Sequence, residues 1–490
     1  MAIQLICNKF GGIRRKSAVF SAEMITASDL QNVELYNTGI NGGVGIRTAK
    51  GNITISDKVP DGEKVINIYK SIHNQVTYFF VHTASSTQSK IYLYDVLTDT
   101  LTLKKQGLTA TRYSCGVDFA QGYSDLFVFA NGVEFLTIEI GAVDDEGDPA
   151  EVTMIEKTDT LGNRVKGLAM AVYNGRLWLA DGNIVRYCVQ ANLKDWATSD
   201  IDVTTSAGYI EFTKPVTALF EYLSTLAVFF KDSSTQITGS YPYSQEEESP
   251  AGCAGYDSLV FHDTDLYFFD YTKKGIFSFK QIVTGEKTLG TNIGIEIQEE
   301  LLKVDGSRLN EIRTLSVVLS DRNEIWWLLP MADESYSTIL IYDYLKQEWV
   351  KRKSQKINCF NIIEDVLYSG AENGKILQEY NSNTFDGEYI QHYYHCSPLN
   401  LGSNTTQKVL YFPPRVAFDL PYINNFFVKY IKNFNTFKTP KVKEITAKFK
   451  NFLIWGVGYW GVNYWASKTT SSMGKFPSAT FKILEIQIYT

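Results

Sequence analysis

Two distant stretches of the chain share a pattern that describes one folding unit. Residues 74–101 read NQVTYFFVHTASSTQSKIYLYDVLTDTL, and residues 323–349 read NEIWWLLPMADESYSTILIYDYLKQEW. Each stretch has an asparagine, an aromatic strand, a polar turn, an aliphatic strand ending in Tyr-Asp, and a bulky apolar residue six positions after the aspartate. The pattern predicts two antiparallel strands and the start of a third, with Asp95 and Asp343 capping a turn through backbone amides.

Weaker copies of this unit lie elsewhere in the chain. They cover residues 168–186, 216–237, 259–279 and 362–380, and each reads strand, tight turn, aromatic strand, turn, strand. One small sheet cannot bury both of its faces alone, so such repeats stack on one another. The sequence therefore predicts an all-β fold, a β-propeller of about five or six blades. A large β-sandwich whose hairpins look alike is the alternative architecture.

The two ends of the chain differ from its middle. Residues 1–60 are glycine-rich and predict an N-terminal arm or cap, which includes the best helical stretch, residues 22–32. The propeller is expected over residues 61–392. Residues 393–490 predict a small C-terminal β region, in which residues 429–450 hold seven lysines and one glutamate among aromatics, and residues 454–465 read IWGVGYWGVNYW.

The composition excludes several classes of protein. Hydrophobic residues make up 44% and charged residues 21%, which is typical of a globular chain. A net charge of −7 argues against coating nucleic acid by bulk charge. No secretory signal pattern and no apolar run long enough for a membrane helix is visible. The six scattered cysteines predict buried small hydrophobes in a chain made in a reducing cytoplasm.

Two motifs suggest a ligand site and have simpler explanations. His392, His395 and Cys396 cluster, but strand alternation would place the two histidines on opposite faces, which opposes a metal site. Gly42–Gly45 with Arg47 suggests a phosphate loop, but Thr48 stands where G-x-G-x-x-G needs its last glycine, so a turn is the better interpretation. We therefore expect these residues to be structural.

The charged runs and a search for catalytic motifs also indicate no functional site. The runs at residues 144–151 (DDEGDPAE) and 246–248 lack the ligand spacing of an EF-hand loop and predict exposed surface. No G-x-S-x-G and no H-E-x-x-H occurs, and sequence cannot nominate a glycosidase pair among 54 acidic residues. Residues 429–450 could track phosphates and stack bases, but a hairpin with a lysine-bearing outer face is favoured. We expect no catalytic residue, no metal and no cofactor.

A series of short motifs occurs in order along roughly residues 10–390. The motifs are Phe10–Ile13, Gln31–Glu34, Gly45–Arg47, Asn174–Trp178, Ile184–Tyr187, Lys194–Trp196, Asn323–Trp327, Ile341–Tyr344 with Trp349, Gly374–Ile376 and Phe385–Gly387. In this order they resemble the tail-hub and nozzle proteins of short-tailed bacteriophages, including the packaged-DNA stabilisation proteins.

The resemblance implies a structural protein of the virion tail, made in the host cytoplasm. It implies a homohexameric ring below the portal and its adaptor, which conducts and retains the double-stranded DNA genome and carries needle, fibre or spike proteins. No catalytic residues come with the family, so the expectation is a protein that is not an enzyme.

Two surfaces are predicted for such a ring. A six-membered ring needs heterologous contacts between two different patches. One patch is predicted at Trp455, Tyr459, Trp460, Tyr464 and Trp465, because exposed aromatics need a partner. The acidic residues Asp144, Asp145 and Glu146 are predicted to face the lumen, where they would repel the phosphate backbone of passing DNA.

Two other functions compete with the tail ring. A carbohydrate-binding or glycan-cleaving propeller would need exposed tryptophans and, for cleavage, paired carboxylates across a cleft. An intracellular interaction propeller would need only an acidic top face. Microscopy of the purified chain separates rings from monomers with glycan affinity.

Overall fold

The computed structural model describes most of the chain. The described residues are 10–13, 25–37, 44–73, 75–121, 124–140, 153–154, 158, 162–199, 201–246, 248–279, 292–307, 315–331, 336–397, 408–410, 425–432, 441–446, 479–481 and 484–489. The chain forms two compact units. One unit comprises residues 50–347 and 352–389, and the other comprises residues 1–49, 348–351 and 390–490.

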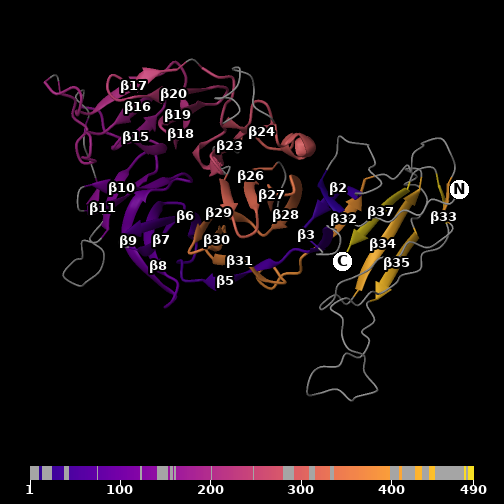
Figure 1. The fold of residues 1–490 in the computed structure, drawn as a ribbon. Coiled ribbons are helices and arrows are strands. Elements are labelled where there is room, and N and C mark those ends of the chain that lie inside the picture. The colour runs from indigo at the N-terminus through magenta and orange to yellow at the C-terminus, as the bar shows by residue number, and fades with distance from the viewer. Residues whose placement is uncertain are drawn as a thin grey trace. The chain divides into compact units, whose positions relative to one another are not determined.

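The larger unit is a β-propeller in which seven sheets form a ring within the described residues (Figure 1). Strands are lettered A to D from the innermost to the outermost, and the A strands of successive blades contact one another, directly or through η1 (Tyr256–Ser258). The first three blades are β6 (Lys64–His73), β7 (Val76–Ala84), β8 (Gln88–Asp95) and β9 (Thr100–Thr109); β10 (Cys115–Gln121), β11 (Ser124–Ala130), β12 (Phe135–Ile140) and β13 (Thr153–Met154); and β14 (Ala169–Tyr173), β15 (Arg176–Asp181), β16 (Ile184–Tyr187) and β17 (Gly208–Glu211).

The other four blades complete the ring. They are β18 (Val216–Tyr222), β19 (Thr225–Phe230), β20 (Ser234–Thr238) and β21 (Ser244–Gln245); β22 (Val260–His262), β23 (Asp265–Asp270) and β24 (Gly275–Ser278); β25 (Leu315–Leu319), β26 (Glu324–Leu329), β27 (Ser337–Asp343) and β28 (Glu348–Ser354); and β29 (Ile357–Ile363), β30 (Val366–Ala371), β31 (Ile376–Ser382) and β5 (Gly51–Ser56). The helical turns η2 (Ile295–Ile297) and α2 (Gln298–Leu301) lie between blades 5 and 6 in the chain.

The predicted propeller is confirmed, but its blade number was too low. The seventh sheet that sequence reasoning missed is blade 2, β10–β13. Its strands A to C lie within residues 115–140 and repeat the strand–turn–strand pattern of the other copies, and its D strand has only two residues. The other predicted copies correspond to blades 1 and 3–7.

The N-terminal side of the chain closes the ring. β5 pairs antiparallel with β31 and forms the outermost strand of blade 7, so residues 50–60 belong to the propeller rather than to an arm (Figure 1). The expected boundary at residue 60 therefore moves to residue 50.

The second unit combines both ends of the chain. Its largest sheet has the order β1-β2-β32-β37-β34-β35, with β1 (Phe10–Ile13), β2 (Ile25–Gln31), β32 (Tyr393–Cys396), β37 (Leu484–Tyr489), β34 (Asn425–Lys432) and β35 (Lys441–Thr446). Two smaller pairs are β3 (Val33–Asn37) with β4 (Val44–Thr48), and β33 (Lys408–Leu410) with β36 (Ala479–Phe481). The best helical stretch, residues 22–32, is largely strand β2, because pairing with β32 overrides local periodicity.

The propeller core lies between neighbouring blades. Aromatic and aliphatic side chains on facing sheets pack in clusters that join blades 1 and 2, 2 and 3, 3 and 4, and 4 and 5. The five described cysteines are buried, as predicted. No described helix is both long enough and apolar enough to cross a membrane.

Candidate functional site: the AB/CD face of the propeller

Antiparallel connections divide the turns of the propeller between two faces. The turns between strands A and B and between strands C and D lie on one face, named here the AB/CD face. Tyr173 Oη donates to the carbonyls of Ser224 (3.1 Å) and Gly239 (3.2 Å), and Tyr222 Oη donates to Thr264 O (3.1 Å). These hydrogen bonds join the turns of blades 3, 4 and 5 into a continuous rim. They hold this face in a defined shape.

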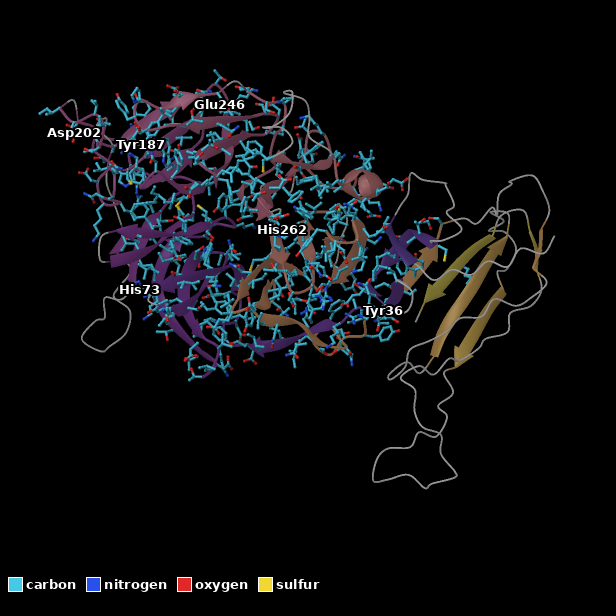
Figure 2. All side chains as sticks on the ribbon, viewed as in Figure 1. Tyr36, His73, Tyr187, Asp202, Glu246 and His262 are labelled. Atoms are coloured by element: carbon cyan, nitrogen blue, oxygen red, sulfur yellow. The ribbon has the colours of Figure 1, made fainter. Side chains whose placement is uncertain are left out.

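Large apolar side chains are exposed mainly on the AB/CD face. Ile201 is 98% exposed, in the C–D loop of blade 3, where Asp202 lies towards the outer end (Figure 2). The exposed members at or beside AB and CD turns are Ile72, Val76, Val96, Leu97, Ile201, Val203, Leu223, Tyr241, Phe261 and Leu345. At or beside BC turns and the connections that lead to the next A strand, the exposed members are Val133, Leu168, Ile295, Leu302 and Tyr336. This asymmetry is typical of a surface that meets a partner.

The repeated aspartates hold two of these apolar tips. Asp95 Oδ1 accepts from the amide of Leu97 (2.8 Å), and Asp343 Oδ1 accepts from the amide of Lys346 (2.8 Å), as the sequence predicts. Hydrogen bonds from Thr98 and from the Leu97 amide lower the pKa of Asp95. The side chains two positions after each aspartate, Leu97 and Leu345, are 96% and 70% exposed. Each turn therefore presents a leucine to solvent on an ordered backbone.

Unpaired carboxylates accompany the apolar tips near the axis. Glu221, Asp263, Asp321, Glu364 and Asp365 are exposed and lie at or beside the AB turns of blades 4 to 7. None of the five forms an ion pair with another residue in the described part of the chain. Desolvation raises the pKa of Glu221. The AB turns of four consecutive blades thus carry uncompensated negative charge.

The opposite face differs, because ion pairs there join neighbouring elements. Lys214 contacts Asp232 (3.2 Å) and Glu248 (3.0 Å), which come from the BC turn and the DA loop of blade 4. Lys64 pairs with Glu372 of blade 7. These charges therefore form ion pairs between elements of the propeller.

The Lys64–Glu372 pair gives a pH-dependent prediction. The hydrogen bond from Lys64 lowers the pKa of Glu372, with a smaller opposing effect of burial. A lowered pKa stabilises the fold above the unfolded-state pKa, and this contribution is lost as the pH falls through the folded-state value. Glu372→Gln should cost at most about 1 kcal/mol at pH 7 because the pair is partly exposed. Urea unfolding of both proteins should converge below about pH 3. A difference that persists unchanged at that pH would contradict this cause.

A buried serine and histidine lie together between blades 1 and 2. Ser114 Oγ accepts from Tyr69 Oη (2.5 Å) and lies 2.8 Å from His82 Nδ1, and Asn67 Nδ2 donates to Tyr69 Oη (3.0 Å). A serine beside a histidine is the pair that nucleophilic catalysis uses. Here both side chains are fully buried, so the hydrogen bonds of the cluster stabilise the contact between blades 1 and 2.

The predicted interface and lumen residues are not placed. Trp455, Tyr459, Trp460, Tyr464 and Trp465, and likewise Asp144, Asp145 and Glu146, lie outside the described residues. Those assignments stay predictions. The AB/CD face was missed because exposure depends on which turns share a face, although Leu97 and Leu345 occupy matching positions in the strongest repeat.

The histidines of the second unit have structural contacts. His392 Nδ1 lies 2.6 Å from the Asn32 carbonyl, and the His395 ring stacks on Tyr393 at 4.7 Å. Cys396 is buried. Within the part of the chain that the structure describes, no group of three or more His, Cys, Asp or Glu side chains is arranged to hold a metal ion.

The glycine-rich motif forms part of a hairpin. Gly45 and Arg47 lie in β4, which pairs with β3. Arg47 forms an ion pair with Glu34 on that neighbouring strand at 2.7 Å. The positive charge of Arg47 therefore forms an ion pair within the hairpin.

Comparisons with known proteins give likenesses of fold. No protein-family model and no curated protein matches the chain. Virginiamycin B lyase from Staphylococcus aureus is 10% identical, with a TM-score of 0.43 over 71% of this chain and 99% of that chain. A streptogramin B lyase is 11% identical, with a TM-score of 0.41 over 67% and 96%. A quinoprotein alcohol dehydrogenase-like protein from Bacteroides thetaiotaomicron is 12% identical, with a TM-score of 0.38 over 70% and 83%.

The expectation that the chain is not an enzyme needs correction. The structures that resemble it include streptogramin B lyases, which are named for a catalytic activity. Exclusion of enzymes from the sequence was therefore wrong for this fold. At these identities the likeness concerns the fold, and lyase activity belongs to those proteins.

Proposed function

We propose that this chain is a structural component of a short-tailed bacteriophage tail, a hub or nozzle that assembles as a ring of identical subunits. The ring would lie below the portal and its adaptor, conduct and retain the DNA genome, and anchor distal tail proteins. The observation that carries the proposal is the asymmetry of the propeller. Its AB/CD face presents exposed apolar tips and unpaired carboxylates, whereas on the opposite face Lys214 and Lys64 form ion pairs with acidic residues of neighbouring elements.

Asymmetry of this kind suits a closed ring. A ring of more than two subunits needs head-to-tail contacts in which two different surfaces of each subunit meet. The AB/CD face of the propeller and the second β unit are two different surfaces that could meet in this way. The ordered resemblance motifs along residues 10–390 support the same proposal independently.

Negative-stain microscopy of the full chain at high concentration tests this function. We expect rings around a central hole, and fewer rings when Leu97→Asp and Leu345→Asp are combined, because the two changes place charge on apolar contact points. A matched control, Val133→Asp on the opposite face, should assemble as the unchanged protein does. Uniform monomers that bind glycans would instead support the carbohydrate-binding propeller.

A further inference from the structure

A patch of aromatic and aliphatic side chains crosses blades 4, 5 and 6 on the AB/CD face. The Phe220 and Phe261 rings stack at 6.1 Å, and Tyr222 meets Phe261 edge-on at 6.4 Å. The His262 ring lies 4.1 Å from the Tyr344 ring, and Figure 2 places His262 near the middle of the propeller. These contacts connect three adjacent blades into one surface.

Apolar tips and carboxylates surround these rings. Leu223 and Leu345 are exposed on this surface, and the carboxylates close enough to act on Tyr344 include those of Asp263 and Asp321. We name the set of Leu223, Phe261, His262, Asp263, Asp321, Tyr344 and Leu345 the blade 4–6 patch.

Nearby cations do not neutralise the patch. Arg322 stacks over Tyr380 at 3.6 Å and pairs with Glu324, and Lys346 pairs with Asp343. Burial raises the pKa of Tyr344, and the charges of Asp343, Asp321 and Asp263 raise it further. The patch thus combines aromatic rings with unpaired negative charge.

Aromatic rings beside carboxylates are suited to ammonium groups. A lysine ammonium over a ring gains a cation–π interaction, and a carboxylate adds a charged hydrogen bond. The propeller uses the first of these itself, because Lys274 Nζ lies 3.5 Å from the Tyr271 ring centroid. A complementary partner would therefore present several lysines and some apolar surface.

The second unit contains a hairpin of this composition. Strands β34 and β35 include Lys429, Lys432, Lys441 and Lys443, with Glu444 as the one acidic residue in the two strands. They pair antiparallel, and β35 is the last strand in the order of its sheet. Lysines on a terminal strand oppose edge-to-edge pairing with other strands. They can still form charged contacts with a complementary acidic surface.

We propose that the blade 4–6 patch of one copy binds the β34–β35 hairpin of a second copy. The proposal rests on the proposed ring, to which it assigns the two unlike surfaces of the head-to-tail contact. Each copy offers both surfaces, so the contact repeats around the ring.

Charge reversal in the full chain tests this pairing. The patch variant carries Asp263→Lys and Asp321→Lys, and the hairpin variant carries Lys441→Glu and Lys443→Glu. Each variant alone should need a protein concentration at least about tenfold higher for half-assembly, measured by mass photometry at low salt. A control with Asp57→Lys and Asp61→Lys on the opposite face should assemble normally. Thermal unfolding checks that every variant is folded.

Mixing the two variants distinguishes contacts between copies from contacts within a copy. In an equimolar mixture, lysine patches meet glutamate hairpins and acidic patches meet lysine hairpins, so assembly should recover as alternating even-numbered rings. A chain that carries all four changes should also recover. Recovery of that chain without recovery of the mixture would mean that the hairpin binds its own propeller, and would overturn the proposal.

The remaining outcomes separate this inference from the proposed function. Normal rings from both single-surface variants would overturn the pairing and leave the ring function standing. An unchanged protein that stays monomeric at all concentrations would overturn both.

Discussion

Replacing Arg352 with alanine is expected to lower the free energy of unfolding by about 3–5 kcal/mol. Arg352 is buried at the end of β28, and its Nη2 donates to Glu379 Oε2 of β31 at 2.6 Å. Glu379 Oε1 accepts from Asn52 of β5 (2.9 Å) and from Ser369 of β30 (2.6 Å). Removing the guanidinium leaves a buried carboxylate without its counter-charge where β5 completes blade 7.

Urea unfolding of the variant and two controls measures this effect. Lys64→Ala breaks a partly exposed ion pair with Glu372 and should cost no more than about 1 kcal/mol. Arg352→Met combined with Glu379→Met should recover much of the loss, because no unpaired buried charge remains. A loss below about 1 kcal/mol for Arg352→Ala would contradict a stabilising role for this cluster at the ring closure.

Trp178→Ala is expected to destabilise the propeller by about 3–5 kcal/mol. The indole is fully buried in β15, its Nε1 donates to Tyr173 O at 3.1 Å, and it packs against Tyr187 at 4.6 Å and Tyr243 at 4.9 Å. Alanine would leave a cavity between blades 3 and 4, where the surrounding sheets can collapse only partly.

Denaturant unfolding with graded substitutions tests the packing account. Trp178→Phe should cost less than Trp178→Ala, because a ring still fills part of the space. Tyr209→Ala, at an exposed position of the same blade, should change the stability by no more than about 0.5 kcal/mol. Equal losses for Trp178→Ala and Tyr209→Ala would contradict the account.

Local repeats predicted most blades because each blade is a meander of strands close in sequence. The alternation of aromatic strands with capped turns was sufficient for blade 1 and blade 6, where Asp95 and Asp343 cap turns as expected. Blade 2 has the same local pattern, because β10, β11 and β12 follow one another within residues 115–140. Its sequence therefore contained the signal for a seventh blade.

Pairing between strands that are distant in the sequence could not be predicted from local patterns. The pairing of β5 with β31 joins residues more than 300 positions apart, and β2 pairs with β32 over a similar separation. The buried Arg352–Glu379 contact depends on that ring closure. Similarly, the blade 4–6 patch combines residues of three blades, so no single segment of the sequence displays it.

The mass of the native assembly tests the central claim most directly. Native mass spectrometry of the full chain at low salt should give about six times the chain mass of 55.4 kDa, as one closed species that does not grow with concentration. A single peak at the mass of one chain, or an open series without a limiting size, would contradict a ring of identical subunits joined head to tail.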